Sequence, residues 1–194
     1  MGRKSLKEER SAMILDAFER CVSQYGLDGS SLERIAEEAG VKRSIIRHYL
    51  GNREDLILAL TERVLLKYRK MTEDMLTLLT GKDCLQTLLD ILFPDVSQTT
   101  SQDIMIMESL IMASERDERV RGLMRDWMEE YVKQFASVIQ QAHPQASKEK
   151  ALTIAYGIIG IYHNHDSLLP LKLAPEYRTR ARQSAELLFE GLKA

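Results

Sequence analysis

The chain has 194 residues, of which 44% are hydrophobic and 29% charged, a balance typical of a globular protein. No apolar run approaches the roughly 20 residues of a membrane span, and no apolar segment follows the charged first residues, so we expect neither a transmembrane helix nor a secretory signal. The net charge of −2 does not by itself indicate a nucleic-acid partner, and we expect a cytoplasmic protein.

Apolar residues recur at helical spacing along almost the whole chain, and no segment alternates with the period of a strand. The sequence therefore predicts an all-α protein. The first helix is expected over about residues 11–25, with Ile14, Phe18, Val22 and Tyr25 facing inward. Gly26 suits the left-handed cap that ends such a helix.

A second and a third helix follow closely, and both are short. Ser30 and Glu33 form a capping box, which predicts a helix over residues 30–39. Gly40 closes that helix, and a third one is expected over residues 42–50. Two short helices joined by a tight turn with glycine at the bend are typical of a helix-turn-helix.

The remaining residues form a larger helical body. Asn52 is a good N-cap, and Asp55 three residues later completes a second capping box. Six further helices are expected at about residues 53–81, 82–92, 103–114, 117–142, 147–168 and 175–192. A polar loop is expected over residues 97–102. We therefore divide the chain into a three-helix head (residues 1–52) and a six-helix body (residues 53–194).

Positive charge is concentrated at the end of the head. Residues 40–53 contain Lys42, Arg43, Arg47 and Arg53 and no acidic residue. Such a local cluster matters more than the charge of the whole chain, because phosphate neutralisation needs charge on one face. The third helix is therefore the best candidate for contact with DNA.

Residues 10–56 resemble the N-terminal DNA-binding domain of the TetR family, with the spacing kept throughout. The resemblance is carried by Gly26, the capped helix over residues 30–39, Gly40-Val41, His48-Tyr49-Leu50 and Arg53-Glu54-Asp55-Leu56. It implies a homodimeric, sequence-specific transcriptional regulator, and for most members a repressor of a palindromic operator. A small apolar or amphipathic ligand is then expected to release the DNA.

The resemblance also implies which residues contact DNA. Those expected at base edges are Lys42, Arg43, Ser44 and Ile45, and those expected near phosphates are Arg47, His48, Tyr49 and Arg53. Elementary chemistry agrees. Arginine and lysine pair with guanine acceptors, isoleucine can pack on a thymine methyl group, and tyrosine and histidine can donate to phosphate oxygens.

Four positions differ from the usual family pattern. The family often has serine at Lys42, a small residue at Ile45, tyrosine at Arg47 and phenylalanine at Leu50. Lys42 and Ile45 bear on which bases are preferred and not on DNA binding itself. Arg47 keeps a side chain that can bind phosphate, and Leu50 changes the packing of the core.

The first residues form a basic arm with two interpretations. Arg3, Lys4, Lys7 and Arg10 could reach DNA, or they could belong to a solvated, disordered terminus.

The last two helices carry apolar or small residues on more than one face, including Ile158 and Ile161, then Ala185 and Leu188. A helix with two apolar faces needs two partners. The TetR resemblance implies that a second copy of the chain provides one of them, in a four-helix dimer interface whose two-fold symmetry matches a palindrome.

Methionines gather in the body and point to a ligand pocket or to an ordinary core. Methionine is flexible and polarizable, which suits an adaptable apolar pocket. The candidate ligand-binding residues are Met71, Met75, Met107, Met124, Trp127, His163 and Asp166. Because the chain has a single tryptophan, it offers few aromatic side chains for a cage around a quaternary ammonium ion.

The polar stretch His163-Asn164-His165-Asp166 follows several isoleucines and has three interpretations. It could form a hydrogen-bond network at the dimer interface or helix end, or supply polar contacts to a ligand. A metal site is less favoured, because His163 and His165 point in different directions on a helix.

Other function classes have weaker support. A ligand-independent architectural DNA-binding protein could use the same fold, and the methionine-rich surface could bind a protein partner. We expect no enzyme, no cofactor and no metal site, since no nucleophile–base pair or phosphate loop is visible. Cys21 and Cys84 are expected to be buried free thiols.

Overall fold

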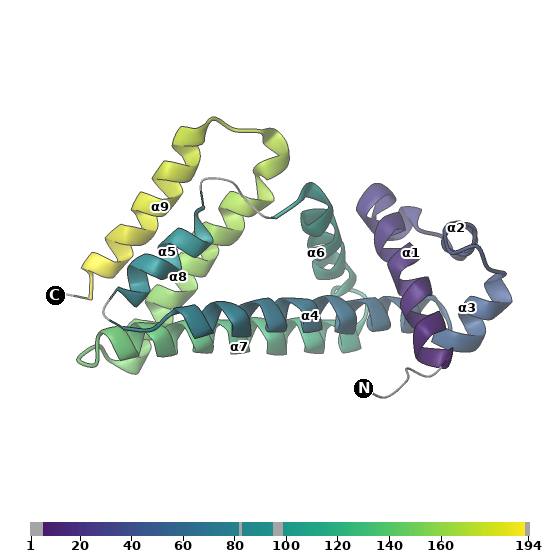
Figure 1. Ribbon diagram of the computed structural model, residues 1–194, viewed down its shortest axis with the longest axis horizontal. Helices are drawn as coiled ribbons and strands as arrows, with labels where there is room; N and C mark the ends of the chain where they lie inside the picture. The colour runs from purple at the N-terminus through teal and green to yellow at the C-terminus, as the bar shows by residue number, and fades with distance from the viewer. Residues whose placement is uncertain (1–5, 82, 95–98, 193–194) are drawn as a thin grey trace. The chain divides into compact units, whose positions relative to one another are not determined.

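The computed structural model describes residues 6–81, 83–94 and 99–192. Over these ranges the chain forms nine α-helices, one short 3-10 helix and no strand (Figure 1). The helices are α1 (Leu6–Gly29), α2 (Leu32–Glu38), α3 (Arg43–Leu50), α4 (Arg53–Leu78), α5 (Cys84–Leu92), α6 (Ser101–Ala113), α7 (Glu118–Ala142), α8 (Lys148–Ser167) and α9 (Pro175–Glu190), with the 3-10 helix η1 at Leu169–Leu171. The prediction of an all-α fold with three helices followed by six is confirmed.

The chain packs into two compact units. The first comprises Met1–Lys67 and Ser101–Arg125, and the second comprises Tyr68–Thr100 and Asp126–Ala194. The long helices α4 and α7 each contribute residues to both units. The functional division at residue 52 concerns DNA binding rather than packing, and it stays a prediction.

In the first unit, α1 is the central element. It packs against α2, α3 and α6. Its apolar stripe interlocks with residues of the neighbouring helices, and the fully buried side chains include Ile14, Phe18, Val22, Ile35, Ile46, Leu56 and Leu60. Burying one such side chain contributes about 1.5–3 kcal/mol. The inward positions predicted for Ile14, Phe18 and Val22 are confirmed, but the one predicted for Tyr25 is wrong: its side chain is 52% exposed, and its ring lies under the guanidinium of Arg34, 4.2 Å from the ring centroid.

In the second unit, α8 packs along α9, and η1 joins the two (Figure 1). One continuous core connects α5, α7, α8 and α9. The large side chains buried in it include Leu88, Leu89, Phe135, Ile139, Ile158 and Ile159. The side chain of Ser147 caps α8 by accepting the backbone N–H of Lys150, which fixes where that helix starts.

Two details of the head differ from the prediction. Helical structure extends from Leu6 to Gly29, and Gly26, at φ 66°, interrupts it with the predicted left-handed turn. The N-cap of α2 is Ser31, which accepts the backbone N–H of Arg34, and not Ser30. Ser30 is buried, and its hydroxyl donates to the Gly26 carbonyl at 2.6 Å, back toward the end of α1.

The predicted polar loop over residues 97–102 is partly wrong. Residues 97 and 98 lie outside the described ranges, and α6 already begins at Ser101. Helix α5 begins at Cys84, two residues later than predicted. Of the basic arm, Arg3 and Lys4 lie outside the described ranges, whereas Lys7 and Arg10 are exposed residues of α1.

Cys21 and Cys84 are buried free thiols, as predicted. Burial raises the pKa of the Cys21 thiol, which keeps it protonated near neutral pH. Among the described residues, no helix combines the length and the apolar content that a membrane span requires.

Candidate functional site

The turn before α3 sets the direction of that helix. Gly40 ends α2 with φ at 64°, in the left-handed region that favours glycine. Val41 then donates its backbone N–H to the Ala36 carbonyl at 2.9 Å. Lys42 is the N-cap of α3 in extended geometry, and its side chain makes no capping hydrogen bond. Helices α2 and α3 therefore form the helix-turn-helix that the sequence predicts.

One face of α3 packs inward and the other carries polar and basic side chains. Ile46 is fully buried and anchors the helix to the core. The exposed side chains are those of Lys42, Arg43, Ser44, Arg47 and His48, and the half-buried ones are those of Ile45 and Tyr49. His48 packs edge-on against Tyr49, with ring centroids 4.9 Å apart. This outer face is positively charged and of the width that enters a DNA major groove.

Arg43, the first residue of α3, forms an ion pair with Glu33 of α2. Both side chains are more than half exposed, at 58% and 62%. Exposed pairs of this kind contribute little stability, about 0–1 kcal/mol. The contact therefore orients the guanidinium at the start of the helix more than it stabilises the fold.

Arg53 makes a different set of contacts from the other basic residues. One guanidinium nitrogen donates to the Ser30 carbonyl at 2.6 Å, and another donates to the Leu27 carbonyl. Both carbonyls follow the Gly26 turn, and the Leu27 carbonyl also accepts the backbone N–H of Ser30 at 3.2 Å. Arg53 thus connects the start of α4 to Leu27 near the end of α1 and to Ser30 after it. These residues lie 26 and 23 positions earlier in the sequence, so the sequence alone does not indicate the contact.

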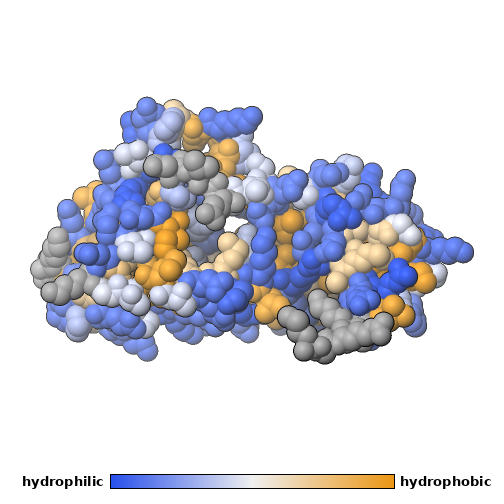
Figure 2. Space-filling view, viewed as in Figure 1, coloured by the Kyte–Doolittle hydropathy of each residue, from blue (hydrophilic) through white to orange (hydrophobic). Residues whose placement is uncertain are grey.

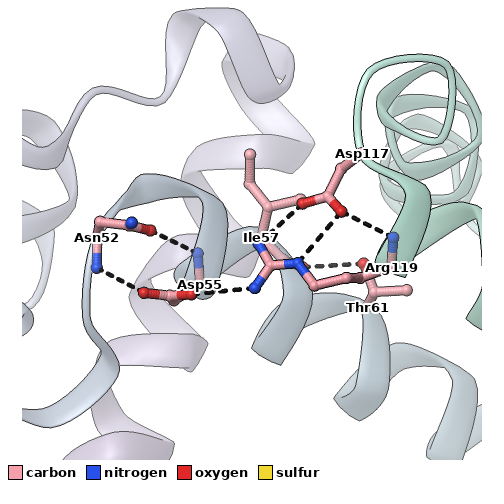
Figure 3. A network of polar contacts seen from close by, with 6 residues as sticks. All are labelled: Asn52, Asp55, Ile57, Thr61, Asp117 and Arg119. Atoms are coloured by element: carbon pink, nitrogen blue, oxygen red, sulfur yellow. Dashed lines mark hydrogen bonds and ion pairs between the residues drawn. The ribbon is translucent and has the colours of Figure 1, made fainter.

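A polar network holds the start of α4 (Figure 3). Asn52 accepts the backbone N–H of Asp55 at 2.8 Å, and Asp55 accepts that of Asn52 at 3.2 Å, so the predicted capping box is confirmed. Arg119 of α7 donates to Asp55 at 3.2 Å and to Asp117 at 3.0 Å. The hydrogen bond from Arg119 is the main reason why the pKa of Asp117 lies below its ordinary value.

The predicted ligand-binding residues fall in both units. Met107 and Met124 are buried in the first unit, and Met71, Met75, Trp127, His163 and Asp166 belong to the second. Met71 is 52% exposed, and Met75 packs at the edge of the core. Trp127 and His163 do come together, with ring centroids 6.4 Å apart and planes at 88°.

Trp127 and His163 belong to a larger group, which we call the aromatic cluster. Its members are Tyr68, Phe93, Trp127, Tyr131, Tyr162 and His163. Trp127 stacks on Tyr131 at 5.7 Å and 9°, and Tyr68 approaches Trp127 edge-on at 6.0 Å. Four of the six, Tyr68, Phe93, Tyr131 and Tyr162, were not predicted as ligand-binding residues from the sequence. The spacing of Trp127, Tyr131 and Phe135 at four-residue steps was a usable signal for one face of α7.

Asp166 closes one end of this cluster in a hydrogen-bond network. Its carboxylate accepts the Thr99 hydroxyl at 2.8 Å and is also hydrogen-bonded to Tyr162. Burial, followed by the charge of Asp166, raises the pKa of Tyr162 well above its usual range. Burial likewise raises the pKa of Tyr131. Both phenols are therefore neutral at any physiological pH.

The outer surface of α7 has an open depression of about 560 Å³. It is lined by Asp126, Glu129, Glu130, Lys133, Gln134 and Ser137. This polar lining includes none of the residues predicted for an apolar ligand. In the described ranges, no group of three or more histidine, cysteine or carboxylate side chains could hold a metal ion.

The N-terminal part of the chain matches a known family. Residues 14–60 match the model of the bacterial regulatory proteins of the tetR family. The HTH-type transcriptional regulator BetI of Burkholderia thailandensis is 32% identical over 65 residues. That match covers 34% of this chain and 33% of the relative, so the chain spans about a third of the length of the curated relatives it matches.

Solved structures resemble the whole described fold. A TetR transcription regulator from Haloarcula marismortui has a TM-score of 0.75 and 18% identity, covering 95% of this chain and 98% of that one. A transcriptional regulator from Saccharomonospora viridis, solved in complex with choline, has a TM-score of 0.76 and 15% identity, covering 94% and 96%. At such identities the likeness concerns the fold. Residues 14–60 thus match the N-terminal domain of the bacterial regulatory proteins of the tetR family, and the described fold as a whole is similar to that of a TetR transcription regulator.

Proposed function

We propose that this protein is a sequence-specific DNA-binding regulator that acts as a repressor. Two copies of the chain bind a palindromic operator, and a small molecule bound by the second unit releases the DNA. The observation that carries the proposal is the outer face of α3, a short basic helix fixed by Gly40 and anchored by Ile46.

The residues of α3 divide into two groups by the contacts they can make. Lys42, Arg43, Ser44 and Ile45 stand at the start of the helix, the part that meets base edges when a helix enters the major groove. Arg47, His48 and Tyr49 lie one turn later, where they can reach phosphates. Arg53 has its guanidinium committed to the Leu27 and Ser30 carbonyls, and we therefore assign it a positioning role.

Exposed apolar side chains on α8 and α9 support a homodimer. Hydrophobic residues interrupt the hydrophilic surface of the protein (Figure 2). Two of the most exposed are Tyr156 of α8, at 69%, and Leu187 of α9, at 64%. A second copy of the same helix pair would cover them in a two-fold arrangement. Two recognition helices related by that symmetry would read the two halves of a palindrome.

The release mechanism follows from linkage. An effector that binds more tightly to a conformation with the wrong spacing of recognition helices lowers the affinity for DNA. DNA in turn lowers the affinity for the effector by the same factor. The neighbour from Saccharomonospora viridis, which holds choline, supports a small-molecule site in a protein of this fold. We place the protein in the cytoplasm, where its free thiols stay reduced, and we assign it no catalytic role.

Selection of bound duplexes from a random-sequence library tests this proposal. The full-length protein is expected to enrich one palindromic sequence, with half-sites about one helical turn apart, or roughly 10 base pairs. Enrichment of no sequence, with binding that disappears in moderate salt, would contradict it and indicate only electrostatic attraction to DNA. A palindrome bound equally well with every effector tested would indicate the ligand-independent alternative.

A further inference from the structure

The aromatic cluster concentrates aromatic side chains in one part of the second unit. The single tryptophan of the sequence argued against an aromatic cage, but the structure adds three tyrosines, a phenylalanine and a histidine from α4, α7, α8 and the segment after α5. Aromatic faces carry negative electrostatic potential and attract cations. The cluster therefore has the composition of a cation site.

Trp127 brings a second, independent observation. Its side chain is 4% exposed, and its indole N–H has no hydrogen-bond acceptor among the residues that the structure describes. A buried donor without an acceptor loses its hydrogen bond to water without a replacement, and native proteins contain few such donors. The indole N–H is thus available to an oxygen atom of a bound molecule.

Asp166 supplies the negative charge. It lies one turn after His163 on α8, and His163 packs edge-on against both Trp127 and Tyr131, at 6.4 and 6.3 Å. The hydrogen bonds of Asp166 with Thr99 and Tyr162 orient the carboxylate, and because both partners are neutral they leave its charge in place.

Access to the cluster is uneven. Trp127 and Tyr131 are buried, whereas Tyr162, His163 and Asp166 are half-buried. The end that carries the carboxylate is therefore the end nearest solvent. A cation can reach Asp166 first and then exchange its water for aromatic contacts.

We infer that the aromatic cluster binds a small organic ammonium ion that also carries an oxygen acceptor. Asp166 balances the positive charge, and the Trp127 N–H donates to the oxygen. This inference rests on the proposed function, because it names the effector class of the same regulator. An anionic effector would be repelled by Asp166, and a neutral apolar one would leave both the carboxylate and the indole N–H unused.

Three probes test the ligand chemistry on the free protein. Choline has both the charge and the oxygen, 3,3-dimethylbutan-1-ol is its uncharged isostere, and tetramethylammonium lacks the oxygen. Trp127 is the single tryptophan of the chain, so its fluorescence reports on the site directly, and calorimetry gives the affinities. We expect choline to bind at least about tenfold more tightly than the alcohol and severalfold more tightly than tetramethylammonium.

Variants test the two assigned residues. Asp166→Asn is expected to weaken choline binding by about tenfold or more, and Trp127→Phe, followed by calorimetry, by about fivefold. The matched control is Asp74→Asn, an exposed carboxylate of the same unit that pairs with Lys70, and it should leave the affinity unchanged. Circular dichroism confirms that each variant is folded.

Two results would overturn the inference. One is saturable binding of the neutral alcohol as tight as that of choline, and the other is no binding of either ammonium probe by the folded wild-type protein. Both are read from wild type, so they decide the question even if a variant fails to fold. Neither measurement involves DNA, so a failure here is distinct from a failure of the proposed DNA binding.

Discussion

Arg119, at the start of α7, donates to the carboxylate of Asp55, which belongs to the capping box of α4, at 3.2 Å (Figure 3). The same guanidinium is held by Asp117 at 3.0 Å. The first turn of α4, the helix after α3, is therefore linked to α7, whose later residues belong to the second unit.

Arg119→Gln is expected to raise the pKa of Asp117 toward its ordinary value of 3.8, because the hydrogen bond from Arg119 is the main cause of its lowering. Folding lowers this pKa, so the associated stability is present above pH 3.8 and is lost as the pH falls through the lower folded-state value. Carboxyl NMR titration measures the change. Arg121→Gln is the control, since Arg121 donates to the Ser114 and Glu115 carbonyls. An unchanged Asp117 pKa in Arg119→Gln would contradict the assignment.

Arg53→Ala is expected to destabilise the protein by about 1–3 kcal/mol, because the part-buried Ser30 carbonyl loses the Arg53 donor and the Leu27 carbonyl keeps only the backbone N–H of Ser30. Arg47→Ala removes an exposed residue of α3 and should change stability by less than about 0.5 kcal/mol. Urea denaturation followed by circular dichroism measures both. Equal stabilities of the two variants would show that Arg53 has no positioning role.

Glu33→Gln is expected to strengthen binding to random-sequence duplexes by about three- to tenfold at low salt, since it removes an acidic group beside Arg43 and frees its guanidinium. Discrimination between operator and random DNA should fall accordingly. Glu38→Gln is the matched control on the same helix, because Glu38 pairs with Arg20 at 2.6 Å. If both variants bind random DNA alike, Arg43 is not restrained by Glu33.

Leu187→Glu is expected to convert the dimer to a monomer, because a charge placed on the proposed contact face of α9 would be desolvated. Leu78→Glu changes a leucine of nearly equal exposure, 62% against 64%, on α4 and should leave the dimer intact. Sedimentation velocity distinguishes the two states. A Leu187→Glu protein that sediments as a dimer would place the interface elsewhere.

Local signals allowed much of the fold to be predicted from the sequence. Gly26 and the capping box of Asn52 and Asp55 act over a few residues, and the structure has both. The choice between Ser30 and Ser31 as N-cap could not be made locally. It depends on the burial of Ser30, which follows from the packing of the whole head.

Contacts between residues far apart in the sequence could not be predicted from it. The guanidinium of Arg53 meets carbonyls 23 and 26 residues earlier, and no spacing rule indicates this. Tyr68 and Tyr162 enter the aromatic cluster from α4 and α8, so their proximity depends on the tertiary fold. Only the face of α7 that carries Trp127 could be recognised in advance.

The central claim is that α3 reads DNA sequence, and fluorescence anisotropy across a salt series tests it most directly. The duplexes are the selected palindrome and a scrambled version, and the proteins are wild type, Arg43→Ala and Tyr49→Phe. We expect wild type to prefer the palindrome by at least about 10³-fold, Arg43→Ala to lose about 1–3 kcal/mol of that preference, and Tyr49→Phe to weaken binding to both duplexes alike. If wild type binds both duplexes equally and Arg43→Ala changes neither, α3 does not read sequence and the proposed function is wrong.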